Sequence, residues 1–218
     1  MPALTLPQAR RVYDRIGRAQ DWQRFYEDAA TSELVDHGAF GAARAVAELG
    51  CGTGRFAAAL LARHLPGDAT YLGVDVSPRM VALATDRLRP WSDRATVALV
   101  DGGGRLPAAD GAADRFVANY VFDLLSPEGT ADALAEARRV LVPGGLLCAA
   151  GLTDGEDGVA AVVSRAWRRV WARWPAVVGG CRPVRLGDAL DPVQWEVRHR
   201  RSVVAWGIAS EAVIAARR

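Results

Sequence analysis

The chain contains the run Val46-Ala47-Glu48-Leu49-Gly50-Cys51-Gly52-Thr53-Gly54-Arg55-Phe56, in which an apolar strand meets a helix through three glycines at alternate positions. Glycine adopts positive φ angles readily and lets a ligand come closer to the backbone than a Cβ atom would permit. The first N–H groups of the helix have no partner within the helix and are free to bind a ligand. The run therefore predicts a ligand-binding turn.

An acidic residue also ends the next strand. The segment Tyr71-Leu72-Gly73-Val74-Asp75 is apolar up to its last residue and follows the glycine turn by about one strand–helix–strand unit. A carboxylate at that place can accept hydrogen bonds from both hydroxyls of a ribose. The two strands and the turn between them indicate a nucleoside-binding βαβ unit.

The spacing of the glycines separates two classes of nucleoside cofactor. Dinucleotide sites use G-x-G-x-x-G, whereas this chain has G-x-G-x-G with Arg55 where the last glycine would stand. Glu48, just before the turn, would repel a pyrophosphate but suits a ligand that carries an ammonium group. S-adenosylmethionine (SAM) has a ribose, an ammonium group and no phosphate. The charge pattern therefore favours SAM and disfavours an NAD-dependent oxidoreductase.

Four segments in collinear order resemble the motifs of the class I SAM-dependent methyltransferases. The segments are residues 48–54, 73–80, Asp101-Gly102 with Leu106-Pro107, and 138–145. The resemblance runs from about Arg10 to Gly151. It implies a cofactor site formed by Glu48, Gly50, Cys51, Gly52, Gly54, Asp75, Val76, Met80, Asp101, Gly102, Asn119, Tyr120 and Tyr13. In the family, the positions of Asp75, Met80 and Asp101 hold the ribose, the adenine ring and its exocyclic amine.

The predicted fold is α/β: a Rossmann-like, seven-stranded, mostly parallel sheet with an antiparallel last strand and helices on both faces. Strands alternating with helices predict the parallel part, and the resemblance supplies the last two strands. The strands are expected at 45–49, 71–76, 96–100, 115–121, 146–152, 195–206 and 211–216, and helices at 55–64, 78–88 and 127–141. Residues 1–40 are expected to form an N-terminal helical lid, and residues 41–218 the SAM-binding domain, within one domain overall.

The lid prediction depends on Tyr13. The segment Val12-Tyr13-Asp14-Arg15-Ile16 is similar to one that closes over SAM in methyltransferases of quinones and phospholipids, the members that this chain resembles most. A helix that simply packs on the edge of the sheet is the alternative, and both can hold because a lid must also pack.

Composition argues against several classes of protein. The net charge of +2 is far from that of a dedicated nucleic-acid binder, and no apolar run approaches the ~18 residues of a membrane span. The N-terminus lacks the pattern of a secretory signal. Three cysteines suit a reducing cytoplasm and show no metal-ligand spacing, so no metal is expected. Basic residues are all arginine, which excludes a lysine base or Schiff base.

Methyl transfer from a sulfonium is an in-line displacement, so the protein mainly aligns the acceptor and excludes water. A base is needed only if the acceptor must lose a proton. The candidates for a catalytic or acceptor-binding role are Tyr120, Asp123, Tyr13 and Arg182. For Tyr120 a packed aromatic is the alternative, and for Asp123 a surface acid. The histidines are not expected to be catalytic, although His37 could approach the pocket from the lid.

The acceptor is expected to be a small or lipid-like molecule. Asn119-Tyr120-Val121-Phe122 stands where methyltransferases of nucleobase amines or protein glutamine carry Asn-Pro-Pro-Tyr. Residues 163–174 place Val163, Trp167, Val170, Trp171 and Trp174 on one helical face with arginines around it. Such a helix either covers a face of the sheet or faces a substrate or an anionic membrane, so peripheral membrane contact stays open.

Two other functions remain compatible with these motifs. A SAM-binding scaffold can catalyse a non-methylating reaction such as a cyclisation, or it can serve as a non-catalytic partner of an active enzyme. Intact glycines and Asp75 count against the partner role, because an unused site need not retain them. The sequence leaves the oligomeric state open.

Overall fold

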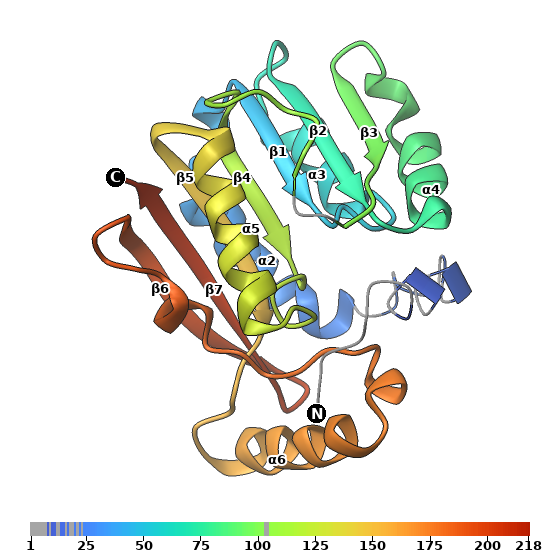
Figure 1. Ribbon diagram of the computed structural model, residues 1–218, viewed down its shortest axis with the longest axis vertical. Helices are drawn as coiled ribbons and strands as arrows, with labels where there is room; N and C mark the ends of the chain where they lie inside the picture. Colours follow the sequence, from blue (N-terminus) through green and yellow to red (C-terminus); the bar gives the residue numbers. More distant parts are fainter. Residues whose placement is uncertain are drawn as a thin grey trace.

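The computed structural model describes residues 8, 10, 11, 14, 15, 17, 20, 22, 24–102 and 105–218. One seven-stranded sheet forms the centre of the molecule (Figure 1). Its strands are β1 (Ala45–Leu49), β2 (Thr70–Asp75), β3 (Ala95–Leu99), β4 (Ala113–Asn119), β5 (Leu141–Leu152), β6 (Trp195–Ala205) and β7 (Ile208–Arg217). The longer helices are α2 (Arg24–His37), α3 (Arg55–Arg63), α4 (Pro78–Leu88), α5 (Pro127–Val140) and α6 (Gly158–Arg173).

The strand order is β3-β2-β1-β4-β5-β7-β6. The first five strands are parallel, and β7 runs antiparallel to both of its neighbours, β5 and β6. This confirms the predicted fold class. Because β1 lies between β2 and β4, Glu48 pairs with Gly73 on one side and Val117 on the other. The glycine turn after β1 therefore lies between the carboxyl ends of two neighbouring strands, where parallel sheets bind ligands.

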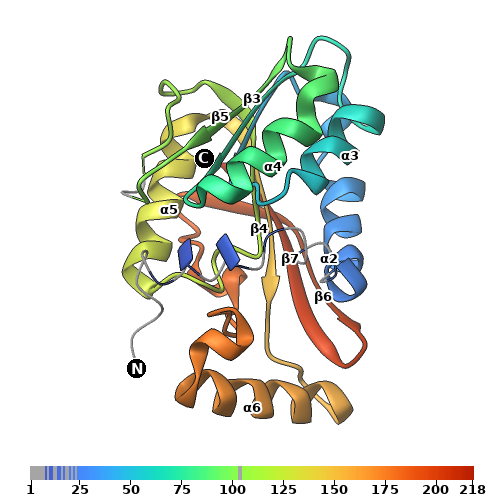
Figure 2. The same cartoon turned by 90° about the vertical axis from the view of Figure 1, so that its right-hand side faces the viewer.

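The two faces of the sheet are covered unequally (Figure 2). One face buries the apolar sides of α2, α3 and α4, including Leu34, Leu60 and Leu88. The other packs against α5 through residues such as Ala133 and Val140. Small residues at these positions let the helix lie close to the strands. Helices thus lie on both faces, as predicted.

The connection from β3 to β4 has no helix in its described part, residues 100–102 and 105–112. A groove of about 450 Å³ consequently lies over the amino-terminal ends of the central strands, lined by residues that include Ala45, Thr70, Leu72, Pro107 and Val140. It is at the end of the sheet opposite the glycine turn. Chemistry at that turn does not involve this groove.

Helix α6 lies beyond the carboxyl ends of the strands and not on a face of the sheet (Figure 1). The indole N–H groups of Trp167 and Trp171 donate to the carbonyls of Cys181 and Gly180, at 2.8 and 2.9 Å. Trp174 is 59% exposed. The Trp-rich side therefore packs mainly on the chain that follows it, so of the alternatives left open for this helix, covering a face of the sheet is not the one observed.

Element boundaries differ from the predicted ones mostly by one or two residues. Strand β4 ends at Asn119 and not at Val121, because Tyr120 has a φ of 55° that breaks the extended backbone. Strand β5 begins at Leu141 and not at Leu146, so residues 142–145 belong to the strand, which pairs with β4 through a register shift between Ala113 and Arg115. The helix predicted around Val12, Tyr13 and Ile16 depends on positions outside the described residues.

Candidate functional site

The glycine turn adopts a backbone that other residues would strain. Gly50, Gly52 and Gly54 have φ angles of 70°, 52° and 73°. The N–H groups of Gly50 and Cys51 both donate to the carbonyl of Val74, at 2.9 and 3.0 Å, which ties the turn to the end of β2. A Cβ atom on Gly50 would lie 2.5 Å from Cγ2 of Val121. The turn therefore requires glycine for conformation and for space.

Asp75 is held rigidly beside this turn. Its Oδ2 accepts the N–H of Gly52 at 3.0 Å, and its Oδ1 accepts the N–H of Ser77 at 2.9 Å. Burial raises the pKa of Asp75, while these two hydrogen bonds lower it. Each carboxylate oxygen keeps further acceptor capacity. The geometry suits a carboxylate that accepts hydrogen bonds from a diol.

Glu48 is buried at the end of β1 and receives a hydrogen bond of 2.6 Å from the hydroxyl of Tyr71. Burial raises the pKa of Glu48 to about 7, and the hydroxyl of Tyr71 and the amide of Asn119 lower it. The amide atoms of Asn119 are themselves buried and make no regular hydrogen bond with the described residues. Asn119 thus offers unsatisfied polar atoms beside Glu48 at the edge of the sheet.

The residues predicted for the adenine side lie along the same edge. Ser77 caps α4 and accepts the N–H of Met80, whose side chain is fully buried, while Val76 is half-buried. The N–H of Val100 donates to the carbonyl of Asp75 at 3.0 Å, which brings the exposed Asp101 and Gly102 next to the end of β2. All of these predicted residues therefore lie after β2 or β3.

Two N-terminal side chains reach this region: Asp14, from the predicted lid segment, and Gln20, which the sequence did not single out. Gln20 lies against Gly52, where an added Cβ would be 3.1 Å from its Oε1, and that oxygen is buried without a hydrogen bond to the described residues. Asp14 accepts the hydroxyl of Ser77 at 2.5 Å. Tyr13 lies outside the described residues. These contacts place Asp14 and Gln20 over the predicted cofactor site.

A second group of side chains lies on the other side of the glycine turn. Tyr120 is buried, and its hydroxyl is 2.9 Å from that of Ser210 in β7. Its ring meets the ring of Tyr26 edge to face with centroids 5.7 Å apart. A φ of 55° at a bulky residue is strained, and such strain is concentrated at functional sites. Burial raises the pKa of both phenols, so neither is a ready base.

Asp123 is buried beside this tyrosine pair and is not a surface acid. Only 1% of it is exposed, and burial raises its pKa to about 7. The thiol of Cys181 and the charge of Arg182 act in the opposite direction. Neither carboxyl oxygen makes a hydrogen bond of regular geometry with the described residues. A carboxyl group in this state is suited to accept a proton near neutral pH.

Glu27 of α2 belongs to the same group, and the sequence analysis missed it. Its pKa is raised to about 7 by burial, and Asp123 raises it further, whereas Arg55 lowers it. Arg55, directly after Gly54, lies 3.2 Å from Oε2 of Glu27 and 2.7 Å from Oδ1 of Asp28. Glu27 therefore lies between Arg55, which follows the glycine turn, and Asp123. Its helical position next to Tyr26 carried no motif that would have revealed it.

Arg182 stands next to Asp123 in space but is engaged by the backbone. Its Nη2 donates to the carbonyl of Leu125 at 2.8 Å, and its own N–H donates to the carbonyl of Asp123 at 2.9 Å. Burial lowers the pKa of the guanidinium. These bonds fix the loop that carries Cys181 against Asp123. The suggestion that His37 could approach the pocket is wrong. His37 contacts His199 and Glu33 at the far end of α2 and does not approach the site.

The residues at the carboxyl edge fit SAM. The glycine backbone leaves a surface that Cβ atoms would fill, Asp75 can accept ribose hydroxyls, and Glu48 suits an ammonium group. Buried polar atoms of Gln20 and Asn119 have no hydrogen-bond partner among the described residues, as expected where a polar ligand supplies one.

Comparison with known proteins also supports a SAM-binding methyltransferase. Residues 46–145 match the family model described as a methyltransferase domain. The chain is 33% identical over 176 residues to a trans-aconitate 2-methyltransferase from Methylobacterium radiotolerans, and the match covers 78% of the chain but only 62% of that relative. The chain therefore spans less than two thirds of this relative's length.

Solved structures share the fold at low identity. The [4+2]-cyclase SpnF superposes with a TM-score of 0.76 at 20% identity, covering 100% of this chain and 98% of the cyclase. The N-methyltransferase NodS from Bradyrhizobium japonicum WM9, in complex with S-adenosylhomocysteine, has a TM-score of 0.63 at 19% identity over 88% of this chain and 87% of NodS. The domain match, the relative and the glycine–aspartate geometry together support a class I SAM-dependent methyltransferase.

Proposed function

We propose that this protein transfers the sulfonium methyl group of SAM to a small-molecule or lipid-like acceptor that is bound beside Asp123. The observation that carries the proposal is the position of Asp123: a buried carboxyl with a pKa raised to about 7, close to a glycine turn that fits SAM. Val121, two residues before it, touches Gly50. The group that binds the cofactor and the group that can take a proton are therefore neighbours.

In this proposal each polar residue of the cofactor site has a role. Asp75 accepts the ribose hydroxyls, Glu48 and Asn119 bind the amino-acid end, and Gly52 lets the cofactor lie against the backbone. SAM would supply an electrophilic methyl group, to which the acceptor's nucleophile would bond in line as S-adenosylhomocysteine leaves. Asp14 and Gln20 cover the site from the N-terminal side and exclude water, in line with the proposed lid.

On the acceptor side, Asp123 takes the proton that a hydroxyl or amine nucleophile loses, so the acceptor gains a methyl group and the carboxylate becomes a carboxylic acid. Glu27 and Tyr26 form the adjoining wall. A neutral acceptor that can lose a proton suits this wall best. A polycarboxylate such as trans-aconitate would face the carboxyl groups of Glu27 and Asp123, and the nearby Arg182 is engaged by Leu125.

Three observations bear on the cellular compartment and on contact with membranes. No described helix has the length and hydropathy to cross a bilayer. Cys51, Cys148 and Cys181 are buried, and none of them is in a disulfide with another described residue, which supports the cytoplasm as the proposed compartment. Trp174, at the exposed end of α6, leaves peripheral membrane contact open for a lipid-like acceptor.

Thermal unfolding with SAM, S-adenosylhomocysteine and NADH tests the cofactor assignment. At about 100 times Kd a ligand stabilises the folded state by about 2.7 kcal/mol, which at this length raises Tm by roughly 5–10 °C. We expect this shift with the two sulfur nucleosides and not with NADH. It is lost in Asp75→Ala and kept in the control Asp68→Ala, whose side chain is exposed. A shift with NADH, or none with SAM, contradicts the proposal.

Acceptor screening with methyl-labelled SAM tests the reaction itself. Label transferred to a hydroxyl- or amine-bearing small molecule supports methyl transfer, and trans-aconitate belongs in the screen as the comparison. Conversion of a substrate without transfer of label would instead favour a non-methylating reaction. SAM binding with no conversion of any substrate unless a second protein is added would favour a partner subunit.

A further inference from the structure

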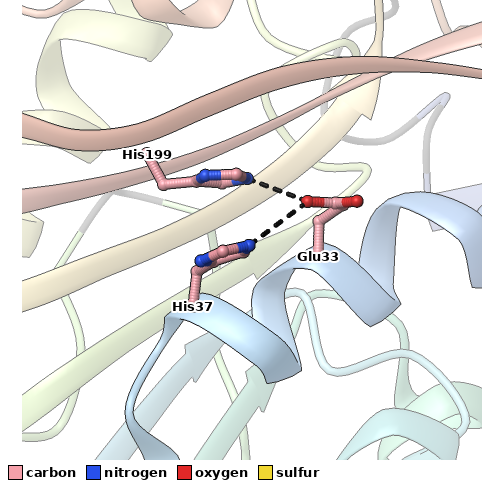
Figure 3. A group of neighbouring side chains, drawn as sticks. All are labelled: Glu33, His37 and His199. Atoms are coloured by element: carbon pink, nitrogen blue, oxygen red, sulfur yellow. Dashed lines mark hydrogen bonds and ion pairs between the residues drawn. The ribbon is translucent and has the colours of Figure 1, made fainter.

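Two histidines that are far apart in sequence meet a glutamate between α2 and β6. His37 and Glu33 lie one helical turn apart on α2, and His199 comes from β6 (Figure 3). The imidazole rings of His37 and His199 are stacked, with centroids 3.6 Å apart and an interplanar angle of 14°. Both rings present Nε2 to Oε2 of Glu33, at 3.6 Å from His37 and 2.9 Å from His199.

From this geometry we propose that Glu33, His37 and His199 bind a zinc ion. One ligand atom from each residue lies within 4.8 Å of the other two, and this is the one such group of three among the residues that the structure describes. Two imidazoles and a carboxylate are a donor set typical of zinc sites with three protein ligands and an open fourth position, which water fills.

The donor spacing is close to what the ion requires. Tetrahedral bonds of about 2.05 Å place two ligand atoms about 3.3 Å apart. The distances of 2.9 and 3.6 Å from Oε2 of Glu33 to the two Nε2 atoms lie on either side of this value. Stacked rings must tilt for their lone pairs to converge on one ion. His37, whose side chain is 46% exposed, has the freedom to do so.

The surroundings orient the carboxylate and leave one oxygen to the ion. Nη1 of Arg201 donates to Oε1 of Glu33 at 2.8 Å, so the other oxygen, Oε2, faces the imidazoles. A hydrogen bond to the second oxygen of a ligating carboxylate is a common way to orient it. The side chains of Glu33 and His199 are 13% and 20% exposed, which makes them ordered yet reachable from solvent.

A zinc ion at this site would cross-link α2 and β6. The ligands come from the last turn of the helix and from an edge strand, and the two elements have no covalent link nearby. An ion bound by both favours the folded state over the unfolded chain, where the three ligands are not assembled. The first turn of α2 carries Tyr26 and Glu27, so the same helix is fixed at both ends.

Zinc titration by calorimetry on the whole protein is the test, with histidine NMR signals as a second readout. We expect one saturable site, perturbation of the signals of two of the three histidines, and a Tm rise of roughly 5–10 °C at about 100 times Kd. His37→Gln and His199→Gln each weaken zinc binding at least about tenfold. His64→Gln, which changes the remaining histidine, leaves it unchanged.

Three results would overturn the proposal: no saturable binding of zinc, binding that both His37→Gln and His199→Gln retain in full, or binding that perturbs the signals of His64 alone. Because the NMR measurement uses the unsubstituted protein, it decides the matter even if a variant fails to fold. None of these readouts involves methyl transfer, so this site is tested independently of the proposed reaction.

Discussion

Asp123, after β4, raises the pKa of Glu27 in α2 although the two residues are distant in sequence. Both carboxyls are largely buried, and each has a pKa of about 7. Burial is the largest cause of the rise in both groups. The pair lies between the glycine turn and the tyrosines Tyr26 and Tyr120, so its protonation state controls the charge that an acceptor meets.

Asp123→Asn is expected to lower kcat/KM by about 10²–10⁴-fold if Asp123 removes the acceptor's proton. In the unsubstituted enzyme, kcat/KM rises with pH as the carboxyl ionises near its pKa of about 7, and this acid limb disappears in the variant. A pH profile of methyl transfer measures both effects. Because Asp123 does not bind the cofactor in this scheme, the SAM-dependent Tm shift persists. Full activity in Asp123→Asn would remove the base from the mechanism.

Glu27→Gln is expected to move the acid limb to lower pH by less than about one unit, because a neutral amide no longer disfavours ionisation of Asp123. Asp28→Asn serves as the matched control, since it removes the other carboxylate partner of Arg55 from an exposed position. We expect that control to leave the limb in place. An unchanged profile in Glu27→Gln would show that the two carboxyls do not act together.

Gly50→Ala is expected to destabilise the fold by about 1–3 kcal/mol. The added Cβ would lie 2.5 Å from Cγ2 of Val121, at a φ of 70°. Gly67→Ala, whose Cβ would meet no atom within 4 Å, should stay within about 0.5 kcal/mol of the parent. Urea unfolding measures both. Adding Val121→Ala to Gly50→Ala should recover part of the loss, because it relieves the contact but not the strained φ. If Val121→Ala recovers none of the lost stability, the whole loss comes from the strained φ at position 50.

Glu48 makes stability depend on pH. Its folded pKa of about 7 lies above the ordinary value of 4.5, so the folded state binds more protons between these values. Stability contributed by the protonated group is therefore lost as pH rises from about 4.5 to 7, by roughly 3 kcal/mol. Glu48→Gln cannot ionise and should show a correspondingly smaller fall between pH 5 and pH 8 in urea unfolding. The exposed Glu156→Gln should behave like the parent.

Local patterns predicted most of the fold. Alternation of strands and helices indicated the parallel sheet, and the antiparallel β7 followed from the resemblance; both are confirmed. Helix α4 was predicted with its exact limits because Ser77 and Pro78 mark its start. The placement of α6 stayed open, because an apolar helical face can pack on a sheet or on a loop such as the one at Gly180 that it contacts.

The cofactor side of the candidate site was predictable for the same local reason. A glycine turn and an acid at a strand end specify their own conformation, so Gly50, Gly52 and Asp75 could be singled out before any fold was known. The roles of these residues in binding remain predictions. Gln20 and Glu27 could not be found this way, because nothing in their neighbourhood of the chain distinguishes them from surface residues.

The amino-acid sequence thus determined the sheet and the glycine turn and predicted the class of cofactor, because each rests on residues adjacent in the chain whose conformational preferences agree. The fold alone brought Glu27 to Asp123, and Glu33 and His37 to His199. These groups come from elements that pack across the sheet. Their proximity, and the burial that raises the pKa values of Glu27 and Asp123, arise only when distant parts of the chain exclude water together.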